Sequence, residues 1–114
     1  MPFINTKVNI SVSEKQKENI KAAYGQSIGC IRGKSESWLM VNIEDCQNLY
    51  FKGDKNTPNA FVEVKIYGSA SKNEYEALTS EITGILSSEL GIAPDRIYIQ
   101  YEETQNWGYN GHNF

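Results

Sequence analysis

The chain has 114 residues, which suits one domain that is small enough to gain stability from oligomerisation. Hydrophobic residues make up 39% of the chain and charged residues 22%, a balance typical of a folded globular protein and not of a disordered one. The net charge is −3 and the eleven Lys and Arg residues are scattered, which excludes a basic surface for nucleic acid or for an anionic membrane. We therefore expect a single domain over residues 1–114 with no nucleic-acid and no membrane partner.

The first half of the chain predicts a strand, a helix and a returning strand. The first strand is expected over residues 3–8, and Ser13 with Gln16 has the spacing of a helix capping box. Apolar residues then recur at helical spacing as far as Gly33, a glycine suited to end the helix. The other elements expected in this half are strands at 38–43 and 48–52 and a loop containing Gly, Asn and Pro at 53–59.

The second half repeats this order of elements. Residues 61–67 are β-branched and aromatic, as in a strand. Ser71 and Glu74 form a second capping box, and the helix that follows is expected to end at Gly91. The last strand is expected over residues 97–101, where apolar and polar side chains alternate.

The two halves align at a constant offset without a gap. Setting Phe3 against Phe61 also matches the following pairs: Lys7 with Lys65, Ser13 with Ser71, Glu18 with Glu76, and Gly33 with Gly91. We therefore predict a duplicated β-α-β unit with copies at about residues 2–45 and 60–103. Because a helical crossover joins parallel strands with a fixed hand, the predicted fold class is α+β, a four-stranded mixed sheet with two helices on one face.

The other face of this sheet is expected to lack a helical cover. Because the predicted strands are apolar at nearly every position, a bare face would be unstable in water and is expected to be buried against copies of the same chain. Residues 48–52 and the C-terminal segment are expected to pair with sheet edges in the assembly. These arguments predict an oligomer without fixing the number of its subunits.

Cysteine and histidine are scarce in this chain. Cys30, Cys46 and His112 form no cluster with metal-ligand spacing, so we expect no metal and no cofactor, and reduced thiols. The amino end lacks the features of a signal peptide, and no apolar run approaches the length of a membrane span. We expect a cytoplasmic protein, which would be secreted only by a route that needs no signal peptide.

Pro2 follows Met1 directly and is a candidate general base. A small second residue allows removal of Met1, which would expose a proline secondary amine that can accept a proton. An unperturbed α-amino group titrates at about pH 7.7–8.0, and burial or a nearby cation lowers its pKa. Such a base suits proton abstraction next to a carbonyl. The Met-Pro start alone is weak support, because many chains begin in this way.

Five segments taken together resemble the macrophage migration inhibitory factor (MIF) family of the tautomerase superfamily. They are MPFINTKV, the pair Gly33-Lys34, PNAFVEVKIYG, GIAPDRIYIQY and the ending NWGYNGHNF, and they cover essentially the whole chain in order. The resemblance implies a homotrimer of the duplicated unit. It also implies an isomerase, a phenylpyruvate tautomerase that needs no cofactor and acts on small α-keto acids or dopachrome-like substrates.

The resemblance implies roles for ten residues. Pro2 matches the family's catalytic base, Lys34 the lysine that binds the substrate carboxylate, and Tyr98 a tyrosine contributed by a neighbouring subunit. Ile66 and Tyr67 fall in the stretch that lines the pocket. The other positions implied to bind substrate are Phe3, Gln100, Trp107, Tyr109 and Phe114.

Several of these residues also have a plain structural interpretation. Lys34 could complement the negative end of the helix that Gly33 terminates. Tyr98 could serve packing, and Trp107 and Tyr109 could plug the oligomer.

Several positions depart from the family pattern. Tyr67 is larger than the usual isoleucine, Gln100 stands for an asparagine, and Trp107 stands for a small aliphatic residue. These changes affect substrate preference more than reaction type.

Two other functions stay open. One is a cytokine-like, immune-modulating trimer with a vestigial pocket and a protein receptor. The other is a different proline-based reaction, such as dehalogenation or hydration, which would need an added Arg and Glu pair that we do not find.

Overall fold

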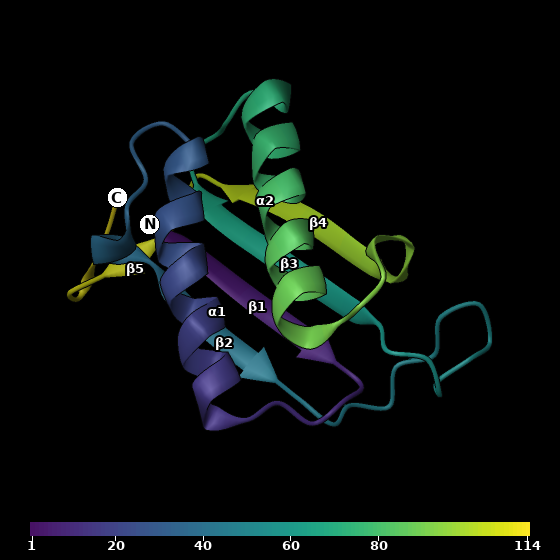
Figure 1. The fold of residues 1–114 in the computed structure, drawn as a ribbon. Helices are drawn as coiled ribbons and strands as arrows, with labels where there is room; N and C mark the ends of the chain where they lie inside the picture. The colour runs from purple at the N-terminus through teal and green to yellow at the C-terminus, as the bar shows by residue number, and fades with distance from the viewer.

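The computed structural model describes residues 1–114 as a four-stranded sheet with two helices on one face (Figure 1). The sheet strands are β1 (Pro2–Val8), β2 (Met40–Glu44), β3 (Ala60–Tyr67) and β4 (Ile97–Thr104). The helices are α1 (Glu14–Ser27) and α2 (Lys72–Leu90), and three 3-10 turns cover Ile28–Cys30, Glu36–Trp38 and Pro94–Arg96. A small hairpin of β5 (Gly108–Tyr109) and β6 (His112–Asn113) closes the chain. The predicted α+β fold is therefore confirmed.

The sheet has the order β2-β1-β3-β4. β1 runs parallel to β2, and β3 runs parallel to β4, as a helical crossover within each β-α-β unit requires. The two units meet where β1 pairs antiparallel with β3, with Pro2 opposite Ile66 and Val8 opposite Ala60. This register places the amino end of β1 beside the carboxyl end of β3.

Both helices begin at the capping boxes that the sequence predicts. The Ser13 hydroxyl accepts from the Gln16 N–H, and the Gln16 side chain accepts from the Ser13 N–H. Ser71 and Glu74 make the same reciprocal pair at the start of α2. At the other end of α2, Gly91 has a φ of 69°, the left-handed conformation that glycine adopts without steric cost.

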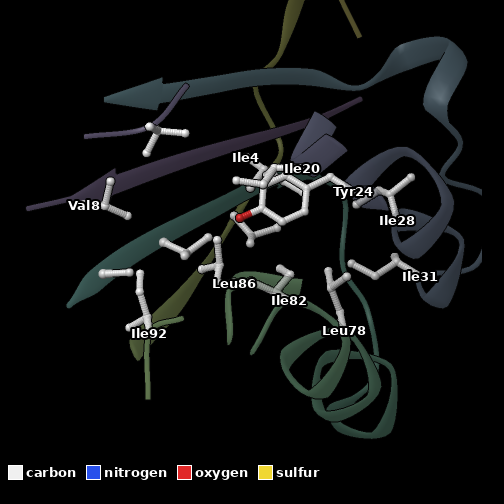
Figure 2. Packing of buried hydrophobic residues seen from close by; sticks show 14 of the residues in the cluster. Ile4, Val8, Ile20, Tyr24, Ile28, Ile31, Leu78, Ile82, Leu86 and Ile92 are labelled. Carbon is white, nitrogen blue, oxygen red and sulfur yellow. The ribbon is translucent and has the colours of Figure 1, made fainter. Parts of the chain in front are cut away.

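The core lies between the helices and the covered face of the sheet, where the labelled side chains of Figure 2 point toward one another. The fully buried residues include Ile4 and Val8 from β1, Ile20 and Tyr24 from α1, and Leu78, Ile82 and Leu86 from α2. The hydroxyl of Tyr24 lies 2.7 Å from the Thr6 hydroxyl, so the polar atoms of both buried side chains have a partner.

Three expected boundaries differ from the structure. α1 ends at Ser27 and is followed by a 3-10 turn, so it stops before Gly33. The returning strand begins at Met40, because the residues just before it form the 3-10 turn Glu36–Trp38. The predicted strand at 48–52 is wrong, because the only pairing there is an isolated bridge between Phe51 and Asp54 within the loop.

The uncovered sheet face is more polar than the sequence argument assumed. The amide of Asn5 donates to the carboxylates of Glu44 (2.8 Å) and Glu63 (3.2 Å), and Asn42 donates to the Asn5 carbonyl (2.9 Å). Lys7 forms an ion pair with Glu63 at 3.5 Å. Alternation along each strand sends the aliphatic side chains to the helices and these polar ones to the open face. The prediction that the open face is apolar is therefore wrong, and this face gives no support for an oligomer.

The two ends of the sheet differ in what surrounds them. Both chain termini, the small hairpin and the loop after α1 gather at one end, and the long loop between β2 and β3 extends from the opposite end (Figure 1). No helix in the structure combines the length and the apolar character needed to cross a membrane.

Candidate active site

A cavity of about 350 Å³ lies at the end of the sheet where the chain begins. Pro2 starts β1 here and is buried, and Phe3 follows it in the cavity wall. The C-terminal segment supplies Trp107 and Tyr109 to the same wall. The structure thus brings together residues from the two ends of the sequence that were predicted to share one site.

Lys34 reaches the same end of the sheet from the loop after α1. Its ammonium donates to the backbone carbonyl of Tyr67 at 2.8 Å, and the Tyr67 N–H donates to the Met1 carbonyl at 3.1 Å. The last turn of α1 contains no basic residue. Lys34 therefore binds the end of β3 and does not cap the helix, which argues against the helix-end interpretation of this lysine.

The amino group at the chain start is electrostatically perturbed. Its pKa is lowered from the usual value of 8.0, first by burial and then by the charge and hydrogen bond of Lys34. Both effects disfavour the protonated form, since burial removes hydration and a nearby cation repels a second positive charge. In the chain as described this group belongs to Met1, and the Pro2 nitrogen, as part of a peptide bond, cannot accept a proton.

Aromatic rings form a continuous wall around this end of the sheet. Tyr67 lies 5.6 Å from Phe114 between ring centroids, and Phe114 stacks on Tyr109 at 6.4 Å. Trp38 meets Tyr109 edge-on at 5.2 Å. The Phe114 N–H donates to the Trp107 carbonyl at 3.0 Å, which fixes the chain end against the hairpin. Such a wall can bind the apolar ring of a substrate.

Trp38 is a pocket residue that the sequence reasoning placed in a strand. It lines the cavity together with its neighbours Ser37, Leu39 and Met40. The flexible end of the Glu36 side chain occupies the space beside Gly25 of α1, so the turn Glu36–Trp38 lies close to this helix.

Three predicted site residues are placed differently. Ile66 is opposite Pro2 in the sheet, but its side chain is buried in the core and does not line the cavity. Tyr98 and Gln100 pair with Phe61 and Glu63 on β3, toward the other end of that strand. Pro2 is opposite Ile66 and Tyr98 is opposite Phe61, and these two β3 positions are five residues apart, about 16 Å at about 3.3 Å per residue. Tyr98 therefore cannot reach Pro2 of its own chain.

The fold and this arrangement define a class: a duplicated β-α-β protein whose second residue, Pro2, opens the first strand inside an aromatic pocket. The profile of the family described as macrophage migration inhibitory factor (MIF) matches residues 1–114, and the chain belongs to this family. Proteins of the family form homotrimers, and tautomerase activity is typical of them.

Relatives of known structure or curated sequence agree with the assignment. The crystal structure of Leishmania major MIF2 is 33% identical, with a TM-score of 0.93, over 100% of this chain and 97% of that one. The macrophage migration inhibitory factor of Mus musculus is 30% identical over 91 residues, 78% of each protein. That of Meriones unguiculatus is 27% identical over 100% of this chain and 99% of its own.

Proposed function

We propose that the chain, once Met1 is removed, is a keto–enol tautomerase of phenylpyruvate-like α-keto acids and dopachrome-like substrates. The observation that supports this best is geometric: Pro2 is buried at the start of β1 in the wall of an aromatic cavity, at the end of the sheet where Lys34 binds the Tyr67 carbonyl. A neutral amine at physiological pH is the base that a proton shift next to a carbonyl needs. This chemistry requires no metal.

Loss of Met1 would also create binding groups for a carboxylate. The Tyr67 N–H now donates to the Met1 carbonyl, so cleavage leaves this donor free beside the new terminus. The Lys34 ammonium has three N–H groups and donates one to the Tyr67 carbonyl, which leaves two for a ligand. One cation and one backbone amide suit the carboxylate of an α-keto acid.

In this mechanism the neutral Pro2 nitrogen takes a proton from the carbon next to the keto group. The C–H electron pair forms the carbon–carbon double bond, and the carbonyl oxygen becomes an enolate oxygen. Tyr98 of a neighbouring subunit, with Gln100 near it, would donate hydrogen bonds to that oxygen as its charge develops. The proton then passes to the oxygen to give the enol, and the reverse sequence converts enol to ketone.

The site is therefore proposed to be shared between subunits of a homotrimer. Within one chain Tyr98 lies at the end of the sheet opposite Pro2, and its side chain is 59% exposed. A catalytic tyrosine in that position can act only on a site of another chain. The family's homotrimeric state supports the same arrangement.

The test compares two samples of the same trimer, one with Met1 removed and one with Met1 retained, as verified by intact mass. We expect the processed sample to convert phenylpyruvate between enol and ketone, and the Met1-retaining sample to lose nearly all turnover. Both samples should have the same circular dichroism and the same mass by light scattering. Full activity with Met1 retained would exclude Pro2 as the base.

Absence of turnover in the processed trimer would favour the alternative, a cytokine-like trimer with a vestigial pocket. The same assay thus separates the two functions, because a protein ligand requires the assembled surface but no proton transfer. Replacing Pro2 by Gly leaves a primary amine at the terminus and should retain a fraction of the activity, which distinguishes loss of the base from loss of the fold.

A further inference from the structure

Tyr98 is held by a cluster of side chains at the end of the sheet remote from Pro2. Its ring meets that of Phe51 at 4.9 Å between centroids, with the planes 68° apart. Phe51 comes from the long loop between β2 and β3, and it lines with Tyr98 an apolar hollow of about 110 Å³. Tyr98 is itself 59% exposed.

Arg96 lies over the Phe51 ring. Its guanidinium lies 5.0 Å from the ring centroid, within the range of a cation–π contact. The same guanidinium contacts Asp54 twice at 3.4 Å, through the backbone carbonyl and through the carboxylate. The Arg96 side chain is only 14% exposed, so these contacts are shielded from solvent more than a surface pair would be.

Asp54 organises the loop that carries Phe51. Phe51 and Asp54 exchange backbone hydrogen bonds of 2.9 and 3.0 Å across a tight turn. The Asp54 carboxylate accepts from the Asn56 N–H (2.8 Å) and from the Thr57 hydroxyl (2.6 Å). The loop is therefore folded around Asp54, and Arg96 ties this folded loop to the start of β4, two residues before Tyr98.

We propose that Arg96 is a positioning residue that acts through Asp54 and Phe51 to orient the Tyr98 ring for the active site of a neighbouring subunit. The inference rests on the proposed function, because it assigns the oriented tyrosine to the tautomerase site. An exposed tyrosine ring that is free to change rotamer would reach a partner's substrate in only part of the molecules. A ring packed against Phe51 is in position before the substrate arrives.

The kinetic test uses Arg96→Gln and Phe51→Leu in the processed trimer, with phenylpyruvate as substrate. We expect kcat to fall about five- to tenfold in each, as loss of one aromatic contact would cause, with little change in KM. Arg96→Lys keeps a cation and should recover part of kcat. Lys55→Gln is the matched control, because Lys55 lies over the Tyr50 ring at 5.6 Å in the same loop without touching Tyr98.

A double-mutant cycle separates positioning from a general structural role. In a Tyr98→Phe background, Arg96→Gln should cause no further loss of kcat, because the hydroxyl it orients is already absent. Additive losses would overturn the proposal. Light scattering at assay concentration accompanies each variant, and a variant that no longer forms the trimer shows that Arg96 serves assembly, which also overturns it.

A second measurement does not depend on activity. In trimers with isotope-labelled tyrosine, the Tyr98 ring signals should move in Arg96→Gln and Phe51→Leu and stay unchanged in Lys55→Gln. Unchanged ring signals in all three variants would refute the positioning of Tyr98 by this cluster. If the processed wild-type trimer shows no turnover, the proposed function and the catalytic part of this inference fail together, and the ring signals still decide whether Arg96 orients Tyr98.

Discussion

Lys34 offers the sharpest test of how the site works, because it is proposed to act on both the base and the substrate. Lys34→Ala removes the ammonium that donates to the Tyr67 carbonyl, and with it the cation proposed to bind the substrate carboxylate. A hydrogen bond to a charged group contributes about 1.5–3 kcal/mol, which corresponds to a rise in KM for phenylpyruvate of about 10- to 150-fold. Loss of the bond to the Tyr67 carbonyl should lower stability by only about 1 kcal/mol.

The pH profile of the same variant tests the amine. Only the neutral amine acts as base, so activity rises with pH as the terminal amine loses its proton. Lys34 lowers the pKa of the Met1 amine in this structure, and we expect it to act in the same way on the Pro2 amine after Met1 is removed, so Lys34→Ala should move the midpoint of the profile upward. Burial is the larger cause of the lowered pKa at Met1, so we expect Lys34→Ala to remove only part of the shift.

The assays are steady-state turnover between pH 5 and 9 and thermal unfolding at one pH. Lys15→Ala is the matched control, since Lys15 is exposed on α1 and its loss changes the net charge equally. A midpoint that stays in place or falls would refute the role of Lys34 in setting the amine pKa. A large drop in melting temperature with an unchanged KM would instead make Lys34 a structural residue.

Two other substitutions test the pocket and the core. Trp38→Ala removes the indole that lines the cavity and meets Tyr109. In parallel turnover assays KM should rise about tenfold for phenylpyruvate but little for pyruvate. Equal increases in KM for both substrates would refute a contact between Trp38 and the substrate ring. Thr6→Val leaves the buried Tyr24 hydroxyl without its partner and should lower the free energy of unfolding by about 1–3 kcal/mol, as measured with denaturant. Adding Tyr24→Phe should restore most of this stability. A double variant as unstable as Thr6→Val would contradict the stabilising role of the hydroxyl pair.

Local sequence signals predicted the helix starts well because their chemistry is local. A capping box needs only a Ser and a Gln or Glu three residues apart, and both predicted boxes are present with reciprocal hydrogen bonds. Gly91 likewise has the left-handed conformation that ends α2. In contrast, Gly33 has a positive φ of 82° but lies in a turn beyond the helix, so the same residue type gave the wrong end for α1.

The predicted strand at 48–52 failed because its backbone bonds go elsewhere. Phe51 bonds to Asp54 within the loop, and the Asn59 amide donates to the Leu49 carbonyl at 3.1 Å. On the other side of the loop, the Asn9 side-chain amide donates to the backbone carbonyls of Lys55 and Thr57. Asn9 is distant in sequence, and the partners within the loop lie outside the segment 48–52, so no propensity within the segment could indicate them.

The polarity of the open sheet face is a second feature that the sequence did not predict. Counting apolar residues along the strands could not tell which face each one takes, and the alternation sends most of them to the helices. The polar residues that remain satisfy one another through Asn5. The polar middle of the open face therefore gives no reason to expect an oligomer, and the reason to expect one lies in the divided site.

The register of the sheet keeps Pro2 and Tyr98 of one chain apart. β3 pairs with β1 and β4 through its whole length, with Pro2 opposite Ile66 and Tyr98 opposite Phe61. A shift of one residue in either pairing would turn the core side chains of β3 to the open face, so the strands cannot slide to bring the two groups together. Mixed trimers can test the consequence directly.

One parent trimer retains Met1 and has an intact Tyr98, and the other is processed and carries Tyr98→Phe. Each parent should have low activity, since one lacks the base and the other lacks the hydroxyl. After unfolding together and reassembly at equal amounts, about a quarter of sites should combine a free Pro2 with an intact Tyr98 from the neighbouring chain. Activity should then rise well above the mean of the parents. Reassembled mixtures with only the mean activity would show that both groups act within one chain, and the divided site would have to be abandoned.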